Sequence, residues 1–275
     1  MRVACIQLRS GIDCKINLEQ SIALIEQVAE QGARYILTPE MTNVVDRKTK
    51  RLLENVSAVE DATELQAYSD IARKRKIWLH IGSMAFKRSN GKLTNRAYVF
   101  SPSGDIVTQY DKIHLFDVSL ENGEAWRESK LFDPGTEVNI VEAETLCVGV
   151  AICYDLRFPH LFRTLAQKGA NILTLPAAFT RQTGRAHWHV LLRARAIECG
   201  AYVLAAGQGG LHEDGRETYG HSMIVSPWGE VVAELAHDEP GFIIADIDIA
   251  EVEKVRRQIP SLGLEQSFEC VKVQS

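Results

Sequence analysis

Short apolar runs rich in β-branched residues alternate along this chain with amphipathic runs of helical length, and the alternation predicts an α/β fold. The first unit is a strand expected at 3–8, a helix at 17–31 that should end at Gly32, and a strand at 34–38. The pattern predicts further helices at 63–75, 159–168, 186–199 and 250–258. Further strands are expected at 77–84, 146–152, 171–176, 201–207, 222–226, 231–235 and 241–247. Turns are expected at 89–92, 101–105 and 226–230. No linker or low-complexity stretch divides the pattern, so we expect a single domain over residues 1–275.

One internal repeat bears on the architecture. The segments QGARYILTP (31–39) and KGANILTLP (168–176) share a glycine–alanine step, an apolar strand and a proline seven residues after the glycine. Any αβ unit can end its helix on glycine, so the similarity could arise by chance. A duplicated αβ unit would instead give two sheets packed face to face with helices outside. We therefore favour a four-layer α-β-β-α sandwich over an open doubly wound sheet.

The charge and the cysteines indicate which partners and compartment to expect. Lysine plus arginine minus aspartate plus glutamate is 31 − 36 = −5, which gives no electrostatic reason to expect nucleic acid or an anionic membrane as partner. No apolar stretch is long enough for a membrane helix, and the N-terminal MRVACIQL does not resemble a signal peptide. The six cysteines form no CxxC pair and no regular spacing. We expect a cytoplasmic protein that acts on a small molecule.

Several common site motifs are absent. The glycine-rich segment 207–215 has His212 where a dinucleotide-binding loop needs its third glycine, and the segment 219–225 has Ile224 where a serine nucleophile elbow needs glycine. His187 and His189 are two positions apart on an expected helix, so they point to nearly opposite sides and cannot chelate one ion. We expect no metal site.

Three chemically complementary residues follow expected strands. Cys153 comes directly after an apolar strand and before a helix, whose N-terminus would favour the thiolate; Glu40 ends RYILTPE, and Lys112 follows IVTQY. Each residue could also have an ordinary structural role: Cys153 as a buried inert thiol, Glu40 as a solvated loop carboxylate and Lys112 as a surface lysine. Together they could supply a nucleophile, a base and a cation for an oxyanion.

The motifs that contain these residues resemble those of a known family. TPEM (38–41), YDKIHLF (110–116) and CYDLRFP (153–159) are similar to the three motifs of the nitrilase, or carbon–nitrogen hydrolase, superfamily. The similarity extends over essentially the whole chain, and the segments at 175–180, 183–198, 219–223 and 226–230 resemble the Nit branch, which contains deaminated glutathione amidase and ω-amidase.

The resemblance implies an α-β-β-α sandwich and a Glu–Lys–Cys triad with no metal or organic cofactor. It makes Cys153 the nucleophile, Glu40 the general base and Lys112 the oxyanion partner. Glu128 matches a second family glutamate that would orient Lys112 or assist proton transfer, and the backbone N–H of Tyr154 would complete the oxyanion hole.

Substrate recognition is predicted from the same resemblance. Arg157, four residues after the nucleophile, is placed to meet a substrate carboxylate, with a structural ion pair as its alternative role. Phe179 and Thr183 match pocket positions of the Nit branch, and His187 would lie behind them. His189 departs from the branch, which commonly has glutamate there.

The expected activity is that of an amidase acting on small carboxylate-bearing amides through a thioester. Deaminated glutathione is the first expected substrate, followed by 2-oxoglutaramate or 2-oxosuccinamate and then N-carbamoyl amino acids. The rival interpretation is an inactive scaffold. The loop at 119–127 does not match the branch closely, in a region that shapes specificity in relatives. A homodimer or larger homo-oligomer is expected.

Overall fold

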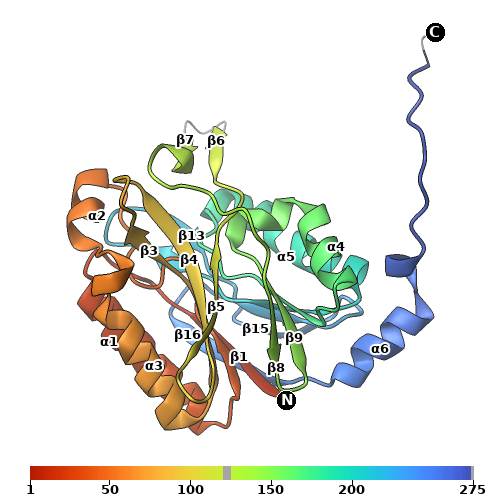
Figure 1. Cartoon of the computed structure of the whole chain (residues 1–275), viewed down its shortest axis with the longest axis horizontal. Helices are drawn as coiled ribbons and strands as arrows, with labels where there is room; N and C mark the ends of the chain where they lie inside the picture. The colour runs from red at the N-terminus through yellow and green to blue at the C-terminus, as the bar shows by residue number, and fades with distance from the viewer. Residues whose placement is uncertain (120–124, 274–275) are drawn as a thin grey trace.

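Two mixed β-sheets lie face to face, with helices along their outer faces (Figure 1). The computed structural model describes residues 1–119 and 125–273, and over these residues each sheet has six strands. The order in the first sheet is β16 (Gly241–Asp246), β1 (Arg2–Gln7), β2 (Tyr35–Leu37), β3 (Trp78–Lys87), β4 (Leu93–Phe100) and β5 (Ile106–Asp111). The order in the second is β15 (Val231–Glu234), β14 (Met223–Val225), β11 (Tyr202–Ala205), β10 (Ile172–Thr174), β9 (Leu146–Val150) and β8 (Ile140–Ala143).

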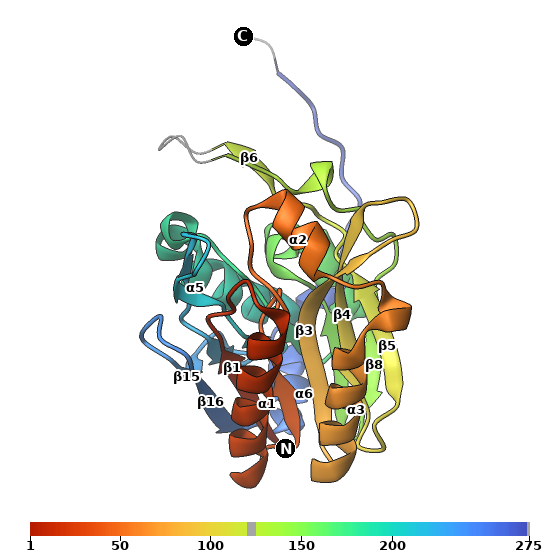
Figure 2. The same cartoon turned by 90° about the vertical axis from the view of Figure 1, so that its left-hand side faces the viewer.

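Two helices cover each outer face. The helices α1 (Cys14–Glu30) and α3 (Thr63–Arg75) lie against the first sheet, and α4 (Pro159–Gln167) and α5 (Arg181–Cys199) lie against the second. Near the C-terminus lies α6 (Ile249–Gln258), and α2 (Thr49–Asn55) lies at the same end of the molecule as the ribbon of β6 (Asp117–Ser119) and β7 (Ala125–Arg127) (Figure 2). A second ribbon, β12 (Gly209–Leu211) with β13 (Glu217–Tyr219), packs against α5. The layers confirm the predicted α-β-β-α sandwich.

The strand β1 shows why the layers form. Its residues alternate between two cores: Val3 and Cys5 face the second sheet, and Ala4 and Ile6 face α1 and α3. All four side chains are fully buried, so the strand reads as a continuous apolar run. Such a strand cannot lie at a solvent-facing surface, and it requires a packed layer on each side.

The two halves of the chain repeat one topology. In each half, a strand, a helix and a second strand form a parallel pair, β1–α1–β2 in the first half and β9–α4–β10 in the second. A third parallel strand follows in both, β3 beside β2 and β11 beside β10. The repeated segments 31–39 and 168–176 contain β2 and β10, which occupy equivalent places. The duplication predicted from these segments is present in the topology.

The main elements form where the sequence predicts, with shifted starts. The helix α1 begins at Cys14 rather than Asn17, because the Asp13 carboxylate caps it by accepting from the backbone N–H groups of Lys15 and Ile16. The helix α5 begins at Arg181 rather than near Ala186 for the same reason, with Thr180 as its capping residue. Over the described residues, no helix combines the length and the apolar character that a membrane span needs.

Candidate active site

Three strands of the two sheets end at the same side of the fold and deliver Glu40, Lys112 and Cys153 to one place. Glu40 follows β2, Lys112 follows β5 directly, and Cys153 lies just after β9. The Lys112 ammonium nitrogen lies 2.8 Å from Oε1 of Glu40, and the Glu40 carboxylate lies close enough to the Cys153 thiol for each to shift the pKa of the other. The structure therefore brings together the three residues that the sequence singled out.

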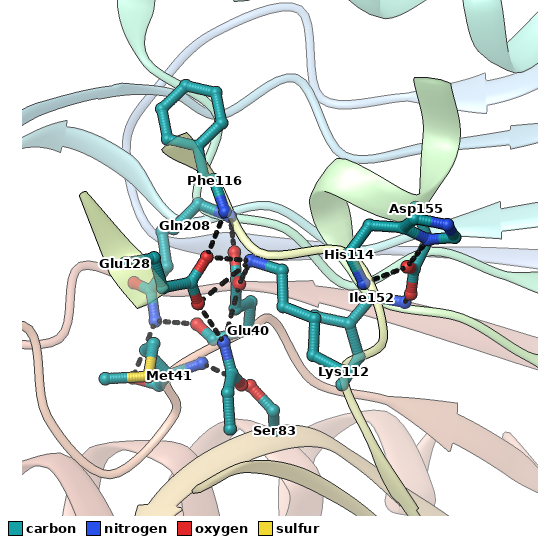
Figure 3. A network of polar contacts seen from close by, with 12 residues as sticks. Glu40, Met41, Ser83, Lys112, His114, Phe116, Glu128, Ile152, Asp155 and Gln208 are labelled. Carbon is teal, nitrogen blue, oxygen red and sulfur yellow. Dashed lines mark hydrogen bonds and ion pairs between the residues drawn. The ribbon is translucent and has the colours of Figure 1, made fainter. Parts of the chain in front are cut away.

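A second carboxylate completes the surroundings of the ammonium group. Glu128, in a short 3-10 helix over Glu128–Lys130, lies 2.9 Å and 3.1 Å from the Lys112 nitrogen through its two oxygens. The amide nitrogen of Asn95 on β4 donates to both Glu40 and Glu128. Figure 3 shows the Lys112 side chain reaching to the two carboxylates. Glu128 and Asn95 thus fix the ammonium group beside Glu40.

The turn that carries the nucleophile is held by a buried aspartate. Asp155 accepts hydrogen bonds from the Ile152 backbone N–H and the Tyr110 hydroxyl through Oδ2, and from the His114 backbone N–H through Oδ1. These contacts join the motif at 110–116 to the motif at 153–159 (Figure 3). Cys153 itself has a φ of +48°, a left-handed conformation that is costly for a residue with a side chain. The surrounding contacts hold the thiol in that strained position.

The segment of Glu40 is fixed by its own backbone partners. Met41, with a φ of +55°, donates its N–H to the Ser83 hydroxyl, and the Gln208 amide nitrogen donates to the carbonyls of Glu40 and Met41. Gly82 is required here because a Cβ atom on it would lie 2.1 Å from the Thr38 carbonyl oxygen. Gln208 belongs to the glycine-rich segment 207–215, which therefore positions the carboxylate.

Burial and mutual charge decide the protonation of the triad. Lys112, Glu40 and Cys153 are 2%, 4% and 6% exposed. Burial alone would lower the pKa of Lys112, but the carboxylates of Glu128 and Glu40 raise it well above its ordinary value. Burial would likewise raise the pKa of Glu40, but Lys112 and the hydrogen bonds to this carboxylate bring it below its usual range.

The thiol behaves differently from the sequence-based expectation. Burial, followed by the charge of Glu40, raises the pKa of Cys153 well above its ordinary value, and Lys112 only partly opposes this rise. In this site, burial and the Glu40 charge outweigh any stabilisation of a thiolate by the following helix. The next α-helix, α4, begins only at Pro159, after a 3-10 turn over Cys153–Arg157. The resting site is a neutral thiol beside an ionised carboxylate.

The triad lies in the wall of a cavity of about 270 Å³. Phe179 and Thr183, the two positions expected in the pocket from the resemblance, are among the lining residues, and Tyr154, Trp126 and Phe116 add aromatic surface. The loop at 119–127 contributes Trp126 and Arg127, whereas residues 120–124 lie outside the described part of the chain.

Two arginines of the cavity wall escaped the sequence analysis. The Arg216 guanidinium lies 4.4 Å from the centre of the Trp126 ring, and its Nε is buried without a hydrogen-bond partner among the described residues. Burial lowers the pKa of Arg216, and Asp214 opposes that effect. Arg47 lies over the same ring at 5.8 Å. No local motif marks them, because Arg216 comes from the start of the β13 ribbon and Arg47 from the segment before α2.

Arg157, His187 and His189 lie apart from this wall. The Arg157 guanidinium lies over the rings of Tyr154 and Phe179, at 5.9 Å and 5.6 Å, and its Nη2 is 3.2 Å from Nδ1 of His187. Neither residue is part of the cavity lining, and the role of Arg157 in substrate binding stays a prediction. Among the described residues, one group of donors could share a metal ion: His189, His221 and Glu234, also outside the cavity.

This arrangement defines a class of protein. A buried thiol with a carboxylate able to take its proton and an ammonium group able to hold a developing oxyanion suits acyl transfer through a thioester. The fold and the site are those of a cysteine hydrolase.

Comparison with known proteins agrees with this class. The family model described as carbon–nitrogen hydrolase matches residues 2–257. Proteins named deaminated glutathione amidase are similar to this chain in Synechocystis sp. (37% identical, covering 94% of this chain and 96% of the relative) and in Bos taurus (39%, 94% and 80%).

Solved structures are similar as well. Saccharomyces cerevisiae Nit3, a member of branch 10 of the nitrilase superfamily, has a TM-score of 0.86 at 30% identity, covering 97% of this chain and 96% of that one. A mutant amidase from Nesterenkonia sp. AN1, showing Michael addition of acrylamide at its active-site cysteine, has a TM-score of 0.79 at 25% identity over 94% of this chain and 98% of that one. The chain belongs to the carbon–nitrogen hydrolase family, and it is a hydrolase of carbon–nitrogen bonds other than peptide bonds.

Proposed function

We propose that this enzyme hydrolyses a non-peptide carbon–nitrogen bond of small carboxylate-bearing amides, with deaminated glutathione as the first candidate substrate. The observation that carries the proposal is the contact of Glu40 with both the Cys153 thiol and the Lys112 ammonium group in the wall of one cavity. The names of the relatives from Synechocystis and Bos taurus support this choice of substrate.

The first half-reaction forms a thioester. Glu40 takes the Cys153 proton as sulfur attacks the amide carbon, because the thiol is neutral at rest and the carboxylate is ionised. The Lys112 ammonium group and the Tyr154 backbone N–H hold the negative oxygen, and one such donor is worth about 3–4 kcal/mol. Glu40 returns the proton to the nitrogen, the carbon–nitrogen bond breaks, and the amine leaves: cysteinylglycine from deaminated glutathione, or ammonia from a primary amide.

The second half-reaction releases the acid. Glu40 takes a proton from water, which attacks the thioester carbon, and the same proton returns to the Cys153 sulfur as the carbon–sulfur bond breaks. Glu128 keeps Lys112 charged and in place throughout, since both of its oxygens contact the ammonium nitrogen. No external cofactor is needed to balance these steps.

The cationic wall supports an anionic substrate. Arg216 lies against Trp126, and its Nε makes no hydrogen bond within the described residues, only an ion pair with Asp214 at 3.9 Å, so its guanidinium presents donors that suit a substrate carboxylate. Arg47 lies over the same ring. We assign the binding of the substrate carboxylate to these two arginines. Arg157 would contribute to it only through a different side-chain position.

An assay of amine release tests the proposal, with cysteinylglycine measured for deaminated glutathione and ammonia for the other amides. The panel comprises deaminated glutathione, 2-oxoglutaramate, 2-oxosuccinamate, glutamine and several N-carbamoyl amino acids, with Cys153→Ala as the inactive control. We expect the highest kcat/KM on deaminated glutathione. A higher value on 2-oxoglutaramate assigns ω-amidase activity, one on N-carbamoyl acids assigns carbamoyl hydrolysis, and no release from any of them favours the inactive scaffold.

We further propose a homodimer in the cytoplasm. Large apolar side chains are exposed on the outer surface of α5, on the β14–β15 turn and along the C-terminal segment: Val190, Ile197, Trp228, Leu264, Phe268, Val271 and Val273. Exposed apolar surface of this extent suits a second copy of the chain. All six cysteines are free, as is usual in a reducing compartment. Light scattering coupled to gel filtration should give twice the chain mass of 30.7 kDa.

A further inference from the structure

A cluster of three metal-binding side chains lies outside the cavity, where α5 meets the edge of the second sheet. Nε2 of His189 on α5 is 2.8 Å from Oε1 of Glu234, at the end of β15. Nδ1 of His221, between β13 and β14, is 3.0 Å from the same oxygen. The donor atoms of all three residues lie within 4.8 Å of one another.

The donor set and its dimensions fit a transition-metal ion. Two imidazole nitrogens and one carboxylate are a usual zinc set, with bonds of about 2.0–2.2 Å. Tetrahedral geometry with such bonds places neighbouring donors about 3.3 Å apart. The two distances to Glu234 are 2.8 Å and 3.0 Å, so each imidazole nitrogen needs to move away from this oxygen by only a few tenths of an ångström, and the two nitrogens themselves lie within 4.8 Å of each other.

We propose that His189, His221 and Glu234 bind a divalent transition-metal ion, with Zn²⁺ as the ion to test. The side chains are 35%, 22% and 23% exposed, which leaves room for water in the remaining coordination position. Binding needs an unprotonated nitrogen on each imidazole. The proton that each ring now directs at Glu234 moves to its other nitrogen or to solvent as the ion replaces it.

The cluster is held in place before any ion arrives. The His221 carbonyl accepts a hydrogen bond from the Trp188 indole, which joins this loop to α5, and the His221 ring stacks on Tyr219 at 4.2 Å. Pairing of β14 with β15 sets Glu234 opposite Met223, two residues beyond His221. Such prior positioning lowers the ordering cost of binding.

The carboxylate is also in its ligating form. Oε1 of Glu234 accepts from both imidazole rings, so this one oxygen already faces the two other donors. A bound ion would connect α5 to β15 across 45 residues of sequence. We therefore expect it to stabilise the fold without entering the catalytic cavity.

Two variants separate metal ligation from the hydrogen bonds. In His189→Gln the amide nitrogen takes the place of Nε2, and in His221→Asn it takes the place of Nδ1, so each can still donate to Glu234 but no longer offers an imidazole lone pair. Asn also tolerates the left-handed φ of +52° at position 221. His237→Gln is the matched control, because His237 is an exposed neighbour outside the cluster.

The experiment is equilibrium dialysis against Zn²⁺ after EDTA treatment, on protein whose accessible thiols have been alkylated. Wild type and His237→Gln should bind about one ion per chain, and each of the other variants should bind at least tenfold more weakly. Zinc at a hundredfold excess over Kd should raise the melting temperature of wild type and His237→Gln by roughly 5 °C. It should leave the melting temperatures of His189→Gln and His221→Asn unchanged.

Equal zinc affinity in all four proteins, or none in wild type, would overturn the proposal. If either His189→Gln or His221→Asn melts far below wild type in EDTA, its zinc affinity is not used. The zinc affinity of the other cluster variant then decides whether the proposal holds. Activity plays no part in these measurements, so the proposal stands or falls separately from the amidase function.

Discussion

Replacing Glu40 by glutamine separates the two effects of this carboxylate, which takes the thiol proton and also raises the thiol pKa. Oε1 of Glu40 lies 2.8 Å from the Lys112 nitrogen, and Oε2 accepts from the Ala178 backbone N–H at 2.8 Å. Glutamine fits the same space and keeps one accepting oxygen. It carries no charge and cannot take a proton.

We expect turnover and alkylation to respond differently. A positioned general base contributes about 10²–10⁴-fold, so kcat/KM for amine release should fall by that factor, equivalent to about 3–5 kcal/mol of barrier. The Glu40 charge is the second cause, after burial, of the raised pKa of Cys153. Its removal should shift the pH midpoint of iodoacetamide alkylation of Cys153 to lower pH.

The assay measures amine release and the rate of alkylation from pH 5 to 10, with Glu19→Gln, an exposed glutamate on α1, as the matched control. A thermal melt verifies that the variant is folded. Turnover above a tenth of wild type would refute the role of Glu40 as base. A midpoint that moves to higher pH would refute the electrostatic argument.

Three other changes test neighbouring parts of the account. Lys112→Met should lower kcat about 10²–10³-fold, because the oxyanion loses a donor. It should also move the pH midpoint of Cys153 alkylation to higher pH, because Lys112 lowers the pKa of Cys153. A midpoint that moves to lower pH would contradict this effect of Lys112. Arg216→Gln should lower kcat/KM on carboxylate-bearing amides roughly tenfold to a hundredfold and leave kcat/KM on matched neutral amides unchanged. A larger selective loss in Arg157→Lys would instead show that Arg157 binds the substrate carboxylate. Burial would raise the pKa of Asp111, but hydrogen bonds from Arg96 and Thr94 lower it overall. The ionised carboxylate therefore stabilises the folded state above about pH 4, and this contribution is lost as the pH falls through the lowered pKa. Calorimetry should find that Asp111→Asn lowers the melting temperature more at pH 7 than at pH 3, and an equal decrease at both pH values would contradict this.

Local sequence patterns predicted the parts of the structure that depend on neighbouring residues. Apolar runs located β1, β2 and β9, and the ends of strands indicated Glu40, Lys112 and Cys153 as a convergent set. Helix starts were placed late because a single capping residue, Asp13 or Thr180, extends a helix beyond its apolar stripe.

Features that depend on distant pairing were not visible in the sequence. Arg216 reaches the cavity only because its ribbon folds back beside Trp126. The two-residue spacing correctly separated His187 from His189, yet His189 finds its partners on β15 and in the loop before β14. The thiol pKa depends on burial and on a carboxylate 113 residues away in the chain, whereas the sequence argument considered only the following helix.

Mass spectrometry of an acid-quenched reaction tests the central claim most directly. With deaminated glutathione, or whichever panel amide is turned over fastest, the peptide that contains Cys153 should gain the mass of the substrate minus its amine leaving group, which is cysteinylglycine for deaminated glutathione and ammonia for a primary amide. The adduct should be removed by hydroxylamine and be absent from Cys153→Ala, which should release no amine. Amine release by Cys153→Ala at more than a hundredth of the wild-type rate, or an acyl adduct on another residue, would contradict a thioester mechanism at Cys153.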